Sequence, residues 1–272
     1  MKAIIIGGGS IGRRHAANLE TLGVACRIVD IDEIGNIDTI LLEKYDMGFV
    51  CSPSIYHIEH CTKLLDRNIP TFCEKPLFTQ FNQNALKLSI ESEVKNITTM
   101  VGCNLRFTPE VKNIPEDTKY ISVYFGYDLR KWRPGTDHLK SYSANKDLGG
   151  GVLLDVIHEL DYLYYKFGSI KDITYTRDKV SNVTNDTEDL VTGRIEFSNG
   201  TIADFTLNYL SEHYQRYYDV LDEGVLKRVH FNFEDKNQMY IDEITYFVEH
   251  VKKGEQCMNS FKEATKLLLA TL

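Results

Sequence analysis

Residues 2–12 read Lys2-Ala3-Ile4-Ile5-Ile6-Gly7-Gly8-Gly9-Ser10-Ile11-Gly12. The first five form a short apolar run typical of a buried strand, and residues 13–22 have the apolar spacing of a helix. Between a strand and a helix, Gly-x-Gly-x-x-Gly allows a tight turn, the approach of a pyrophosphate to the backbone, and close packing of helix on strand. The pattern therefore predicts a dinucleotide-binding βαβ unit, with Gly7, Gly9, Ser10, Ile11 and Gly12 at the phosphates.

A carboxylate follows the second predicted strand. Residues 25–29 are followed by Asp30, close to the ~20 residues past the glycines at which an acid binds the adenosine ribose hydroxyls. A carboxylate there repels a 2′-phosphate, so the sequence predicts NAD, with NADP as the alternative cofactor. The other interpretation of Asp30 is a turn-capping residue beside a structural glycine loop.

Strands and helices alternate through the first part of the chain. This alternation is typical of βαβ units, so we expect a doubly wound parallel sheet, a Rossmann domain, over residues 1–115. Ligands bind such sheets beyond the carboxyl ends of the strands. Polar segments stand at those ends: Gly7–Gly12, Ser52-Pro53, Glu74-Lys75-Pro76 and Asn104-Leu105-Arg106. The strands are expected at residues 2–6, 25–29, 47–51, 69–73 and 98–103, and the helices at 13–22, 37–44, 57–68 and 79–95.

The pattern changes near residue 115. Several strands follow one another without helices between them, so we expect residues 116–272 to form an α+β substrate domain with an open, mainly antiparallel sheet and helices on one face. The uncovered face is a natural oligomer surface, which predicts a homodimer or homotetramer through this sheet. Strands are expected at 120–127, 170–176, 190–197, 201–209, 217–221 and 225–233, and helices at 149–168, 237–253 and 260–271.

The composition excludes several classes of protein. The chain has 272 residues, of which 43% are hydrophobic and 26% charged, as in globular proteins. Its net charge of −8 argues against a nucleic-acid partner, because nucleic-acid binders usually present basic surfaces. No apolar run approaches the ~20 residues that cross a bilayer, and the start lacks the layout of a signal peptide. The six cysteines form no Cys-x-x-Cys pair and are interpreted as buried free thiols, so we expect a cytoplasmic protein without a membrane partner.

Five motifs run through nearly the whole chain: Gly7-x-Gly9-x-x-Gly12, Ser52-Pro53-x-x-x-His57, Glu74-Lys75-Pro76, Asn104-x-Arg106-Phe107, and Gly149-Gly150-Gly151 with Asp155, His158 and Asp161. Together they resemble the Gfo/Idh/MocA family (glucose–fructose oxidoreductase and inositol dehydrogenase), which are NAD(P)-dependent sugar oxidoreductases. Glu-Lys-Pro at a strand end is highly specific in this combination. The region from Trp132-Arg133-Pro134-Gly135 to Asp161 looks like members found among surface-polysaccharide and sialic-acid-type sugar genes.

The sequence departs from the family pattern at two places. The helix and strand that usually follow the acidic residue are shortened after Asp30. The family's catalytic helix commonly spaces its Asp and His four residues apart, whereas Asp155 and His158 are three apart. Counted back from His158, Leu154 would take the position of the Asp. Since residues three and four apart share a helix face, we expect Asp155 and His158 to face one pocket.

Hydride transfer between a sugar carbon and a nicotinamide needs a base for the alcohol proton, stabilisation of the oxyanion, and close approach of the carbon. We expect His158 to be the base, because imidazole titrates near working pH. Lys75, on a backbone fixed by Pro76, is expected to stabilise the oxyanion. Asp155 is expected to orient His158 or to hold a neighbouring sugar hydroxyl. The resemblance implies comparable roles for the matching Lys, Asp and His of the family.

The predicted substrate-binding residues are Arg106, Trp132, Arg133, Asp155 and His158. Arg106 contacts the substrate or nicotinamide, or else pairs with an acid. Trp132 and Arg133 stack on and hold a sugar or its anionic group, or else anchor their loop. Asp161 is expected to be structural, as a cap or salt-bridge partner.

The predicted cofactor side also includes Ser52, Pro53, His57, Glu74 and Lys75. His57 is expected to line the cofactor side, and His60 to lie on the surface. The i,i+3 spacing of these two histidines suits a metal, but no further Cys or His follows in a ligand pattern, so no metal is predicted.

The predicted function is thus the NAD(P)-dependent oxidation or reduction of a sugar CH–OH group, on a nucleotide-linked or acidic sugar. The rival is a non-catalytic NAD(P)-binding sensor or regulatory protein of the same fold. The presence of both Lys75 and His158 favours the enzyme.

Overall fold

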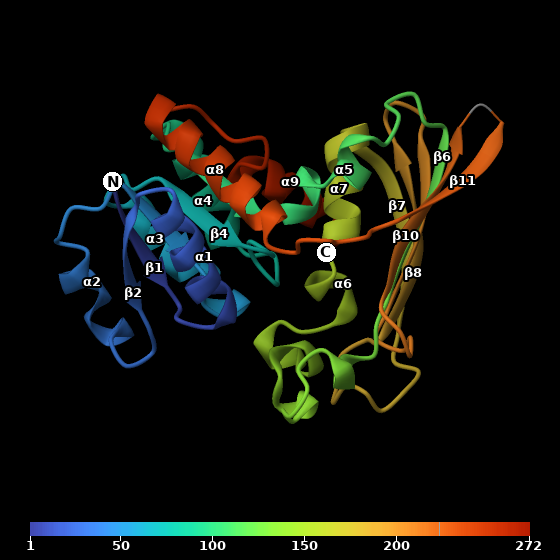
Figure 1. Ribbon diagram of the computed structural model, residues 1–272, viewed down its shortest axis with the longest axis horizontal. Coiled ribbons are helices and arrows are strands. Elements are labelled where there is room, and N and C mark those ends of the chain that lie inside the picture. The colour runs from blue at the N-terminus through green and yellow to red at the C-terminus, as the bar shows by residue number, and fades with distance from the viewer. Residues whose placement is uncertain (223) are drawn as a thin grey trace. The chain divides into compact units, whose positions relative to one another are not determined.

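The computed structural model describes residues 1–222 and 224–272, of residue 222 the backbone alone (Figure 1). These residues form two compact units. Unit 1 contains residues 1–104, 235–270 and 272, and unit 2 contains residues 105–234 and 271. The chain therefore first passes from unit 1 to unit 2 near the expected domain boundary at residue 115. The expectation that residues 116–272 form one domain is corrected, because residues 235–270 return to unit 1.

Unit 1 is built on a five-stranded parallel sheet. Its strands are β1 Lys2–Ile6, β2 Ala25–Val29, β3 Met47–Val50, β4 Thr71–Glu74 and β5 Thr99–Gly102. Their order is β2-β1-β3-β4-β5, so the chain winds outward from β1 in both directions. All residues of β3 and β5 are buried, as expected for parallel strands that are covered on both faces. The expected doubly wound Rossmann sheet is confirmed.

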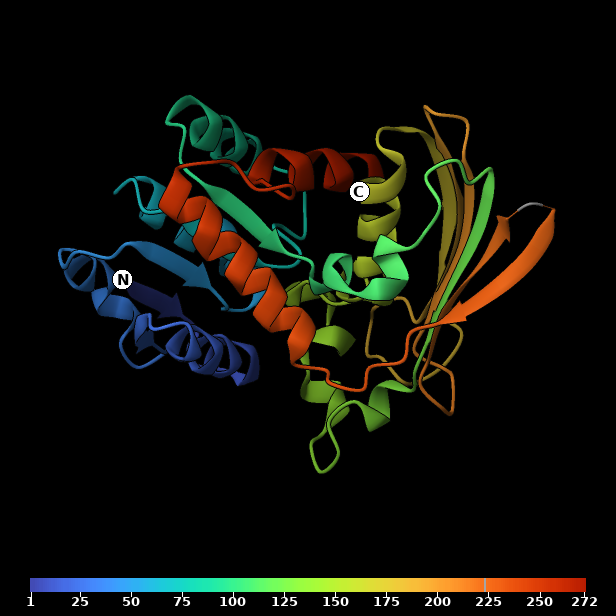
Figure 2. The same ribbon diagram turned by 45° about the horizontal axis from the view of Figure 1, so that its top comes forward.

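Helices cover both faces of this sheet. They are α1 Ser10–Thr21, α3 His57–Leu65, α4 Gln83–Val94, α8 Gln238–Lys253 and α9 Phe261–Thr271. Phe49 of β3 packs with Phe72 of β4 against Phe247 of α8 on one face. The neighbouring Gly48 faces the other side, where a Cβ would lie 2.6 Å from a methyl group of Leu64 on α3. Figure 2 shows α8 (orange-red) beside α1 (dark blue).

The C-terminal helices belong to unit 1 because their long-range contacts lie there. The amides of Asn18 on α1 and Asn237 before α8 exchange two hydrogen bonds, of 3.2 and 2.9 Å. Asn259, before α9, donates from Nδ2 to the carbonyl oxygen of Val101 in β5 at 3.0 Å. The helices themselves match the predicted spans closely, whereas their place against the Rossmann sheet does not follow from helical spacing.

The connection between β2 and β3 is short, as the sequence predicted. It contains one 3₁₀ turn, η1 Ile34–Asn36, and one turn of helix, α2 Ile37–Ile40. No described strand lies beyond β2, which is an edge of the sheet. Ile34 of η1 lines a pocket at the end of β2.

Unit 2 contains a six-stranded sheet. Its strands are β6 Tyr120–Gly126, β7 Ile170–Asp178, β8 Leu190–Phe197, β9 Ile202–Asn208, β10 Gln215–Asp222 and β11 Val225–His230. Their order is β11-β10-β6-β9-β8-β7, with β6 and β9 parallel and the other pairs antiparallel. Buried and half-buried residues alternate along β6 and β9, so one face packs inward. The expected open, mainly antiparallel sheet is confirmed.

The glycine-rich stretch forms two helices on this sheet, α6 Val152–Asp155 and α7 His158–Phe167. Val156 between them has φ −109° and ψ 32°, which is not helical. Val156 and Ile157 are both β-branched, which lowers helix propensity. In addition, segments outside the helix hold the carboxylate of Asp155. The expectation of one continuous helix over residues 149–168, with Asp155 and His158 on one helix face, is therefore wrong.

All six cysteines are free thiols and five of them are buried, as predicted. Within the described residues, no helix combines the length and apolar composition of a membrane span. The same residues contain no group of three or more His, Cys, Asp or Glu side chains arranged to hold a metal ion.

Candidate active site

The three glycines of the Gly7-x-Gly9-x-x-Gly12 motif differ in the space around them. Gly7 has φ +108°, and a Cβ there would lie 2.6 Å from the carbonyl group of Cys51, so only glycine fits. A Cβ on Gly12 would strike the carbonyl oxygen of Gly7, because α1 packs closely on β1. No atom of the described residues lies within 4 Å of the corresponding position on Gly9. Gly9 is therefore the glycine beside which a pyrophosphate has room to approach the backbone.

The N-terminus of α1 suits an anion. Ser10 and Ile11 are its first residues, and Gly9 is its N-cap with an extended backbone. Among the residues that the structure describes, no side chain caps this end, and the first turn contains no acidic residue. The first backbone N–H groups and the positive end of the helix dipole therefore favour a phosphate here.

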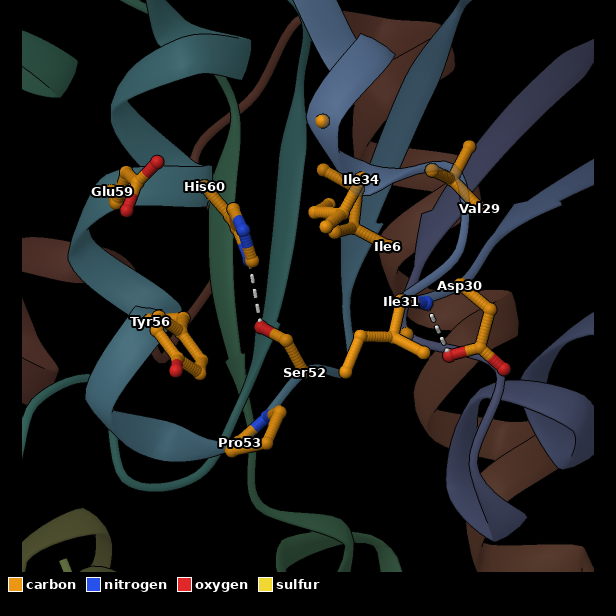
Figure 3. Close-up of a pocket in the computed structure, with 12 residues that line it drawn as sticks. Ile6, Val29, Asp30, Ile31, Ile34, Ser52, Pro53, Tyr56, Glu59 and His60 are labelled. Carbon is orange, nitrogen blue, oxygen red and sulfur yellow. Dashed lines mark hydrogen bonds between the residues drawn. The ribbon is translucent and has the colours of Figure 1, made fainter. Parts of the chain in front are cut away.

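A cavity of about 400 Å³ lies in unit 1 at the carboxyl ends of β1, β2 and β3 (Figure 3). It brings together four predicted cofactor residues: Gly7, Asp30, Ser52 and Pro53. Asp30 is exposed, and its Oδ1 accepts a hydrogen bond from the backbone N–H of Ile31 at 3.0 Å. Its carboxylate is thus oriented at the edge of the cavity, where ribose hydroxyls would donate to it.

The opposite wall of the cavity comes from the 3₁₀ turn η2 (Ser54–Tyr56) and from α3, as Figure 3 shows. Nδ1 of His60 lies 2.8 Å from Oγ of Ser52, and His60 is buried. Burial lowers the pKa of His60, so its imidazole is neutral near pH 7. The expectation of a surface position for His60 is wrong, because His60 belongs to the inner face of α3 together with His57 and Leu64.

The lining of the cavity fits the adenosine half of a dinucleotide. Ile31 and Ile34 offer apolar surface for a planar base, and Asp30 offers a carboxylate for the ribose. The two charged residues of the lining, Asp30 and Glu59, are both acidic. The lining therefore contains no cation for a 2′-phosphate and suits NAD better than NADP.

The Glu74-Lys75-Pro76 motif follows β4, and its Lys75–Pro76 peptide bond is cis. His57 joins this loop to the loop after β3: its Nδ1 lies 2.7 Å from the carbonyl oxygen of Pro76 and its Nε2 lies 2.8 Å from that of Ser52. Burial lowers the pKa of His57, although both carbonyls oppose this effect. His57 is buried between the two loops and is not part of the cavity lining.

Glu74 is bonded to a histidine that the sequence patterns did not single out. Its Oε1 lies 2.6 Å from Nε2 of His15, a fully buried residue of α1. Burial acts to raise the pKa of Glu74, but the hydrogen bond and charge of His15 and the charge of Lys75 outweigh it and lower that pKa. Glu74 is thus an oriented carboxylate at the end of β4.

Asp155 is a buried acceptor of three hydroxyl groups in unit 2. Tyr142 donates to its Oδ1 at 2.5 Å, and Ser143 and Tyr209 donate to its Oδ2 at 2.7 and 2.9 Å. The 3₁₀ turn η6 (Tyr142–Ala144) reaches Asp155 because Gly150 has no side chain; a Cβ there would lie 2.7 Å from the carbonyl oxygen of Ser143. Asp155 therefore connects η6, α6 and the end of β9.

Two buried ion pairs hold the first turn of α7, which begins with His158. Nε of Arg216 on β10 lies 2.7 Å from Oε1 of Glu159. Arg106, on η3 (Asn104–Phe107), donates from Nε and Nη2 to the two oxygens of Asp161, each at 2.7 Å. Asp161 is thus confirmed as a salt-bridge partner. Of the two interpretations of Arg106, pairing with an acid is the observed contact.

Asp155 and its three hydroxyl donors, Tyr142, Ser143 and Tyr209, are called the Asp155 cluster. Trp132 and Arg133 lie around this cluster. Trp132 packs edge-on against Tyr209 with ring centroids 5.3 Å apart, and its indole N–H donates to the backbone of its own loop. The Arg133 guanidinium lies 5.8 Å from the ring centroid of Tyr142. Since Tyr209 and Tyr142 both donate to Asp155, the structure brings these three predicted substrate residues together.

Four residues of the hydrogen-bond networks around Glu74 and Asp155 were missed by sequence reasoning: His15, Tyr142, Ser143 and Tyr209. A signal existed for His15, which shares the buried face of α1 with Gly12, Ala16 and Leu19. An ionisable residue on an apolar helix face is the same signal that pointed to residues 149–161. The three hydroxyl donors lie on the 3₁₀ turn η6 and directly after β9, where no local pattern marks them.

The glycine turn, the helix N-terminus and the Asp30 cavity define a dinucleotide-binding Rossmann protein. Comparison with family profiles agrees: the "Oxidoreductase family, NAD-binding Rossmann fold" matches residues 1–102 and the "GFO/IDH/MocA C-terminal domain" matches residues 120–227. Together these two matches cover well over half of the chain. The chain therefore belongs to the GFO/IDH/MocA oxidoreductase family.

Individual relatives are more distant. Glucose-6-phosphate 3-dehydrogenase of Bacillus subtilis (strain 168) is 26% identical over 200 residues, which are 62% of this chain and 55% of that protein. The chain spans about half the length of the curated relatives that it matches. The crystal structure of myo-inositol 2-dehydrogenase from Lactobacillus plantarum has a TM-score of 0.80 and 19% identity, covering 100% of this chain and 95% of that one. The crystal structure of GenD2 from gentamicin A biosynthesis, in complex with NAD, has a TM-score of 0.80, 18% identity, and coverage of 99% and 91%. At these identities the two structures establish the fold.

Proposed function

We propose that this protein is an NAD(P)-dependent oxidoreductase that transfers a hydride between C4 of the nicotinamide and a sugar carbon, acting on a CH–OH group. The observation that carries the proposal is the cavity of unit 1. Its oriented Asp30 carboxylate offers the ribose contact of a dinucleotide, and the open backbone at Gly9, two residues after the lining residue Gly7, offers the pyrophosphate contact, in a chain of an oxidoreductase family. NAD is the proposed cofactor and NADP the alternative.

The bound nicotinamide would supply the hydride acceptor or donor. His158 is proposed as the general base that takes the proton of the substrate hydroxyl in oxidation and returns it in reduction. Lys75 is proposed to donate from its ammonium group to the same oxygen and to stabilise its negative charge. Asp155, whose carboxylate accepts three hydroxyl groups, is proposed to position the segment that leads into His158.

The residues proposed to hold the cofactor fall into two groups. Those at the cavity and the first turn of α1 contact the nucleotide directly: Gly7, Gly9, Ser10, Ile11, Gly12, Asp30, Ser52 and Pro53. His57 and Glu74 act through the loop that contains Lys75, since both are hydrogen-bonded on either side of it.

The proposed substrate is an acidic or nucleotide-linked sugar of a surface-polysaccharide type. Arg133 supports an anionic group, because it forms no ion pair within the described residues. Its neighbours Arg130 and Lys131 are by contrast paired with Asp128 and Glu212. Trp132 and Arg106 remain proposed substrate residues, although both have structural contacts of their own.

A homodimer or homotetramer through the open face of the unit 2 sheet is also proposed. The alternating burial along β6 and β9 supports it, since one face of the sheet is packed and the other is not. The proposed location is the cytoplasm, in keeping with six free cysteines.

A second candidate function is a non-catalytic NAD(P)-binding sensor or regulatory protein. One observation favours it: the carboxylate of Asp155 is occupied by Tyr142, Ser143 and Tyr209, and does not share a helix with His158. A sensor would keep the cofactor cavity and lose the catalytic arrangement.

Turnover separates the two functions. A panel of sugars, sugar acids and sugar nucleotides is incubated with NAD and with NADP, and absorbance at 340 nm is followed for the wild type, Lys75→Ala and His158→Ala. Lys87→Ala, on an exposed side chain of α4, is the control. Turnover that is lost in the first two variants and kept in the control supports the enzyme. Cofactor binding without turnover on any substrate, with unchanged ligand affinity in both variants, supports the sensor.

A further inference from the structure

Lys75 stands between two residues that are each held by a buried histidine. The carboxylate before it, Glu74, lies 2.6 Å from Nε2 of His15, and the carbonyl oxygen after it, on Pro76, lies 2.7 Å from Nδ1 of His57. Both histidines come from helices of unit 1, α1 and α3. The side chain before Lys75 and the backbone after it are therefore held by two different helices.

His15 sits in an aromatic box. Its ring centroid lies 5.8 Å from that of Phe49, 5.3 Å from that of Phe72 and 6.1 Å from that of Tyr240. Its Nδ1 has no hydrogen-bond partner among the described residues, although the side chain is fully buried. An unsatisfied buried nitrogen is destabilising, and an apolar side chain would fill such a box without that cost. The gain that offsets it is the bond from Nε2 to Glu74.

The sheet leaves a slot for this carboxylate. Gly102 of β5 pairs with Glu74 of β4, and a Cβ on Gly102 would lie 2.7 Å from the ring of Phe72 and 3.3 Å from Oε1 of Glu74. The side chain of Glu74 is only 15% exposed. The bond to His15 and the absence of a side chain at position 102 therefore give the Glu74 carboxylate one orientation.

Four titratable groups that interact with the Glu74 carboxylate have pKa values shifted toward their neutral forms. Glu74 itself stays ionised, since its pKa lies below the ordinary value. Among the groups that interact with Glu74, burial raises the pKa of Tyr240, Cys51 and Cys73 and lowers that of His57. The charges of Glu74 and Lys75 act on each other, and the charges of Arg14 and Glu243 act on the neighbouring Tyr240.

We propose that His15 is a positioning residue, which fixes the Glu74 carboxylate beside Lys75 so that the carboxylate keeps the Lys75 ammonium protonated. An opposite charge nearby favours the charged form of a lysine, and an ammonium that stabilises an oxyanion must keep its proton. The use of that ammonium rests on the proposed function, whereas the His15–Glu74–Lys75 arrangement concerns the protein without substrate.

The test is the titration of Lys75 in the full chain. Lysines are reductively methylated with ¹³C, the Lys75 signal is assigned by its loss in Lys75→Arg, and its pKa is read by NMR. Glu74→Gln keeps the shape and removes the charge, so the pKa of Lys75 is expected to fall by about one unit. Glu93→Gln, at an exposed pair with Lys262, is the control and leaves Lys75 unchanged. An unchanged Lys75 titration in Glu74→Gln would overturn the proposal.

The role of His15 is read from two further variants. His15→Gln keeps an N–H donor toward Glu74, so the pKa of Lys75 in this variant is expected to equal that in the wild type. His15→Leu removes the donor and is expected to move the pKa of Lys75 toward the Glu74→Gln value. Equal titration of Lys75 in His15→Leu and in the wild type would contradict the positioning role. Glu74→Gln, which removes no buried ring, keeps the proposal testable if His15→Leu does not fold.

These outcomes are independent of turnover, because the titration uses neither substrate nor cofactor. If the pKa of Lys75 falls in Glu74→Gln but the protein turns over no substrate, the proposed enzymatic function is overturned and the His15–Glu74–Lys75 arrangement is still supported. In an active enzyme, Glu74→Gln is expected to move the alkaline limb of the kcat/KM profile to lower pH, because Lys75 loses its proton earlier. A merely structural defect would lower the whole profile without moving that limb.

Discussion

The guanidinium of Arg106 and the carboxylate of Asp161 form two parallel hydrogen bonds of 2.7 Å, and both side chains are almost fully buried. The pair joins η3 to the first turn of α7, one turn after His158. Arg106 therefore supports the helix that begins with the proposed base. Loss of either partner is expected to be costly, because the other charge would stay buried without its bidentate counter-ion.

Asp161→Asn is expected to destabilise the fold by about 3–5 kcal/mol, because the guanidinium of Arg106 stays buried without its counter-charge. Asp204→Asn is a matched control: Asp204 also forms a bidentate pair, with Arg194, but at 32% and 60% exposure. Its expected cost is about 0–1 kcal/mol. Urea unfolding measures both. Equal losses would contradict the account of Arg106.

Substitutions at two glycines of the Gly7-x-Gly9-x-x-Gly12 motif are expected to separate effects on NAD binding from effects on folding. Gly9→Ala is expected to leave the free energy of unfolding within about 0.5 kcal/mol of the wild type, since the new methyl group meets open space. It should weaken NAD roughly tenfold or more, because that space is where the pyrophosphate approaches. Gly12→Ala should instead destabilise the fold by about 1–3 kcal/mol, since its Cβ strikes the Gly7 carbonyl. Calorimetry with NAD and urea unfolding test the pair. The reverse pattern would contradict the assignment of Gly9.

Asp30→Asn is expected to weaken NAD by roughly 10- to 100-fold, the worth of a hydrogen bond to a charged group of about 1.5–3 kcal/mol. The affinity for NADP should fall less or should rise, because the variant lacks the Asp30 carboxylate that repels the 2′-phosphate. Glu59→Gln, on the opposite wall of the same cavity, is the control and should change NAD affinity little. The measurement is the ratio of the two dissociation constants. A ratio unchanged in Asp30→Asn contradicts the ribose role.

The Asp155 cluster should behave as a coupled unit. Tyr209→Phe is expected to cost about 1.5–3 kcal/mol, because it removes a buried hydrogen bond to a carboxylate. In a double-mutant cycle with Asp155→Asn, an interaction energy of about 0.5–3 kcal/mol is expected. The hydroxyl group of Tyr120 donates to the more exposed Asp204. Tyr120→Phe is therefore the control and should show no coupling to Asp155→Asn. Additive losses of Asp155 and Tyr209 would show that the hydroxyl network does not hold the carboxylate.

The cofactor half of the site could be predicted because its determinants are local. Gly7, Gly9 and Gly12 lie within six residues, and each meets a constraint of one strand–turn–helix unit. Asp30 follows at the end of the adjacent parallel strand, and parallel strands of one sheet end at the same edge. Short-range pattern and sheet topology therefore sufficed for the cavity.

The rest depends on contacts between distant residues. The bond from His15 to Glu74 spans 59 positions, and the bond from Asn18 to Asn237 spans 219. No periodicity predicts such pairs, so His15 and the return of α8 to unit 1 were both missed. The break at Val156 was missed for a similar reason. The apolar spacing of Leu154, Ile157 and Leu160 is continuous, whereas the hydroxyl donors that fix Asp155 come from elsewhere in the chain.

The most direct test of the central claim follows the hydride itself. Members of the sugar panel deuterated at the carbinol carbon are incubated with the wild type and NAD, and the cofactor is analysed by mass spectrometry and NMR. The account predicts a substrate whose deuterium arrives at C4 of the nicotinamide, with transfer abolished in His158→Ala and Lys75→Ala. Deuterium that is found only in the solvent, or equal transfer in the two variants, would contradict it.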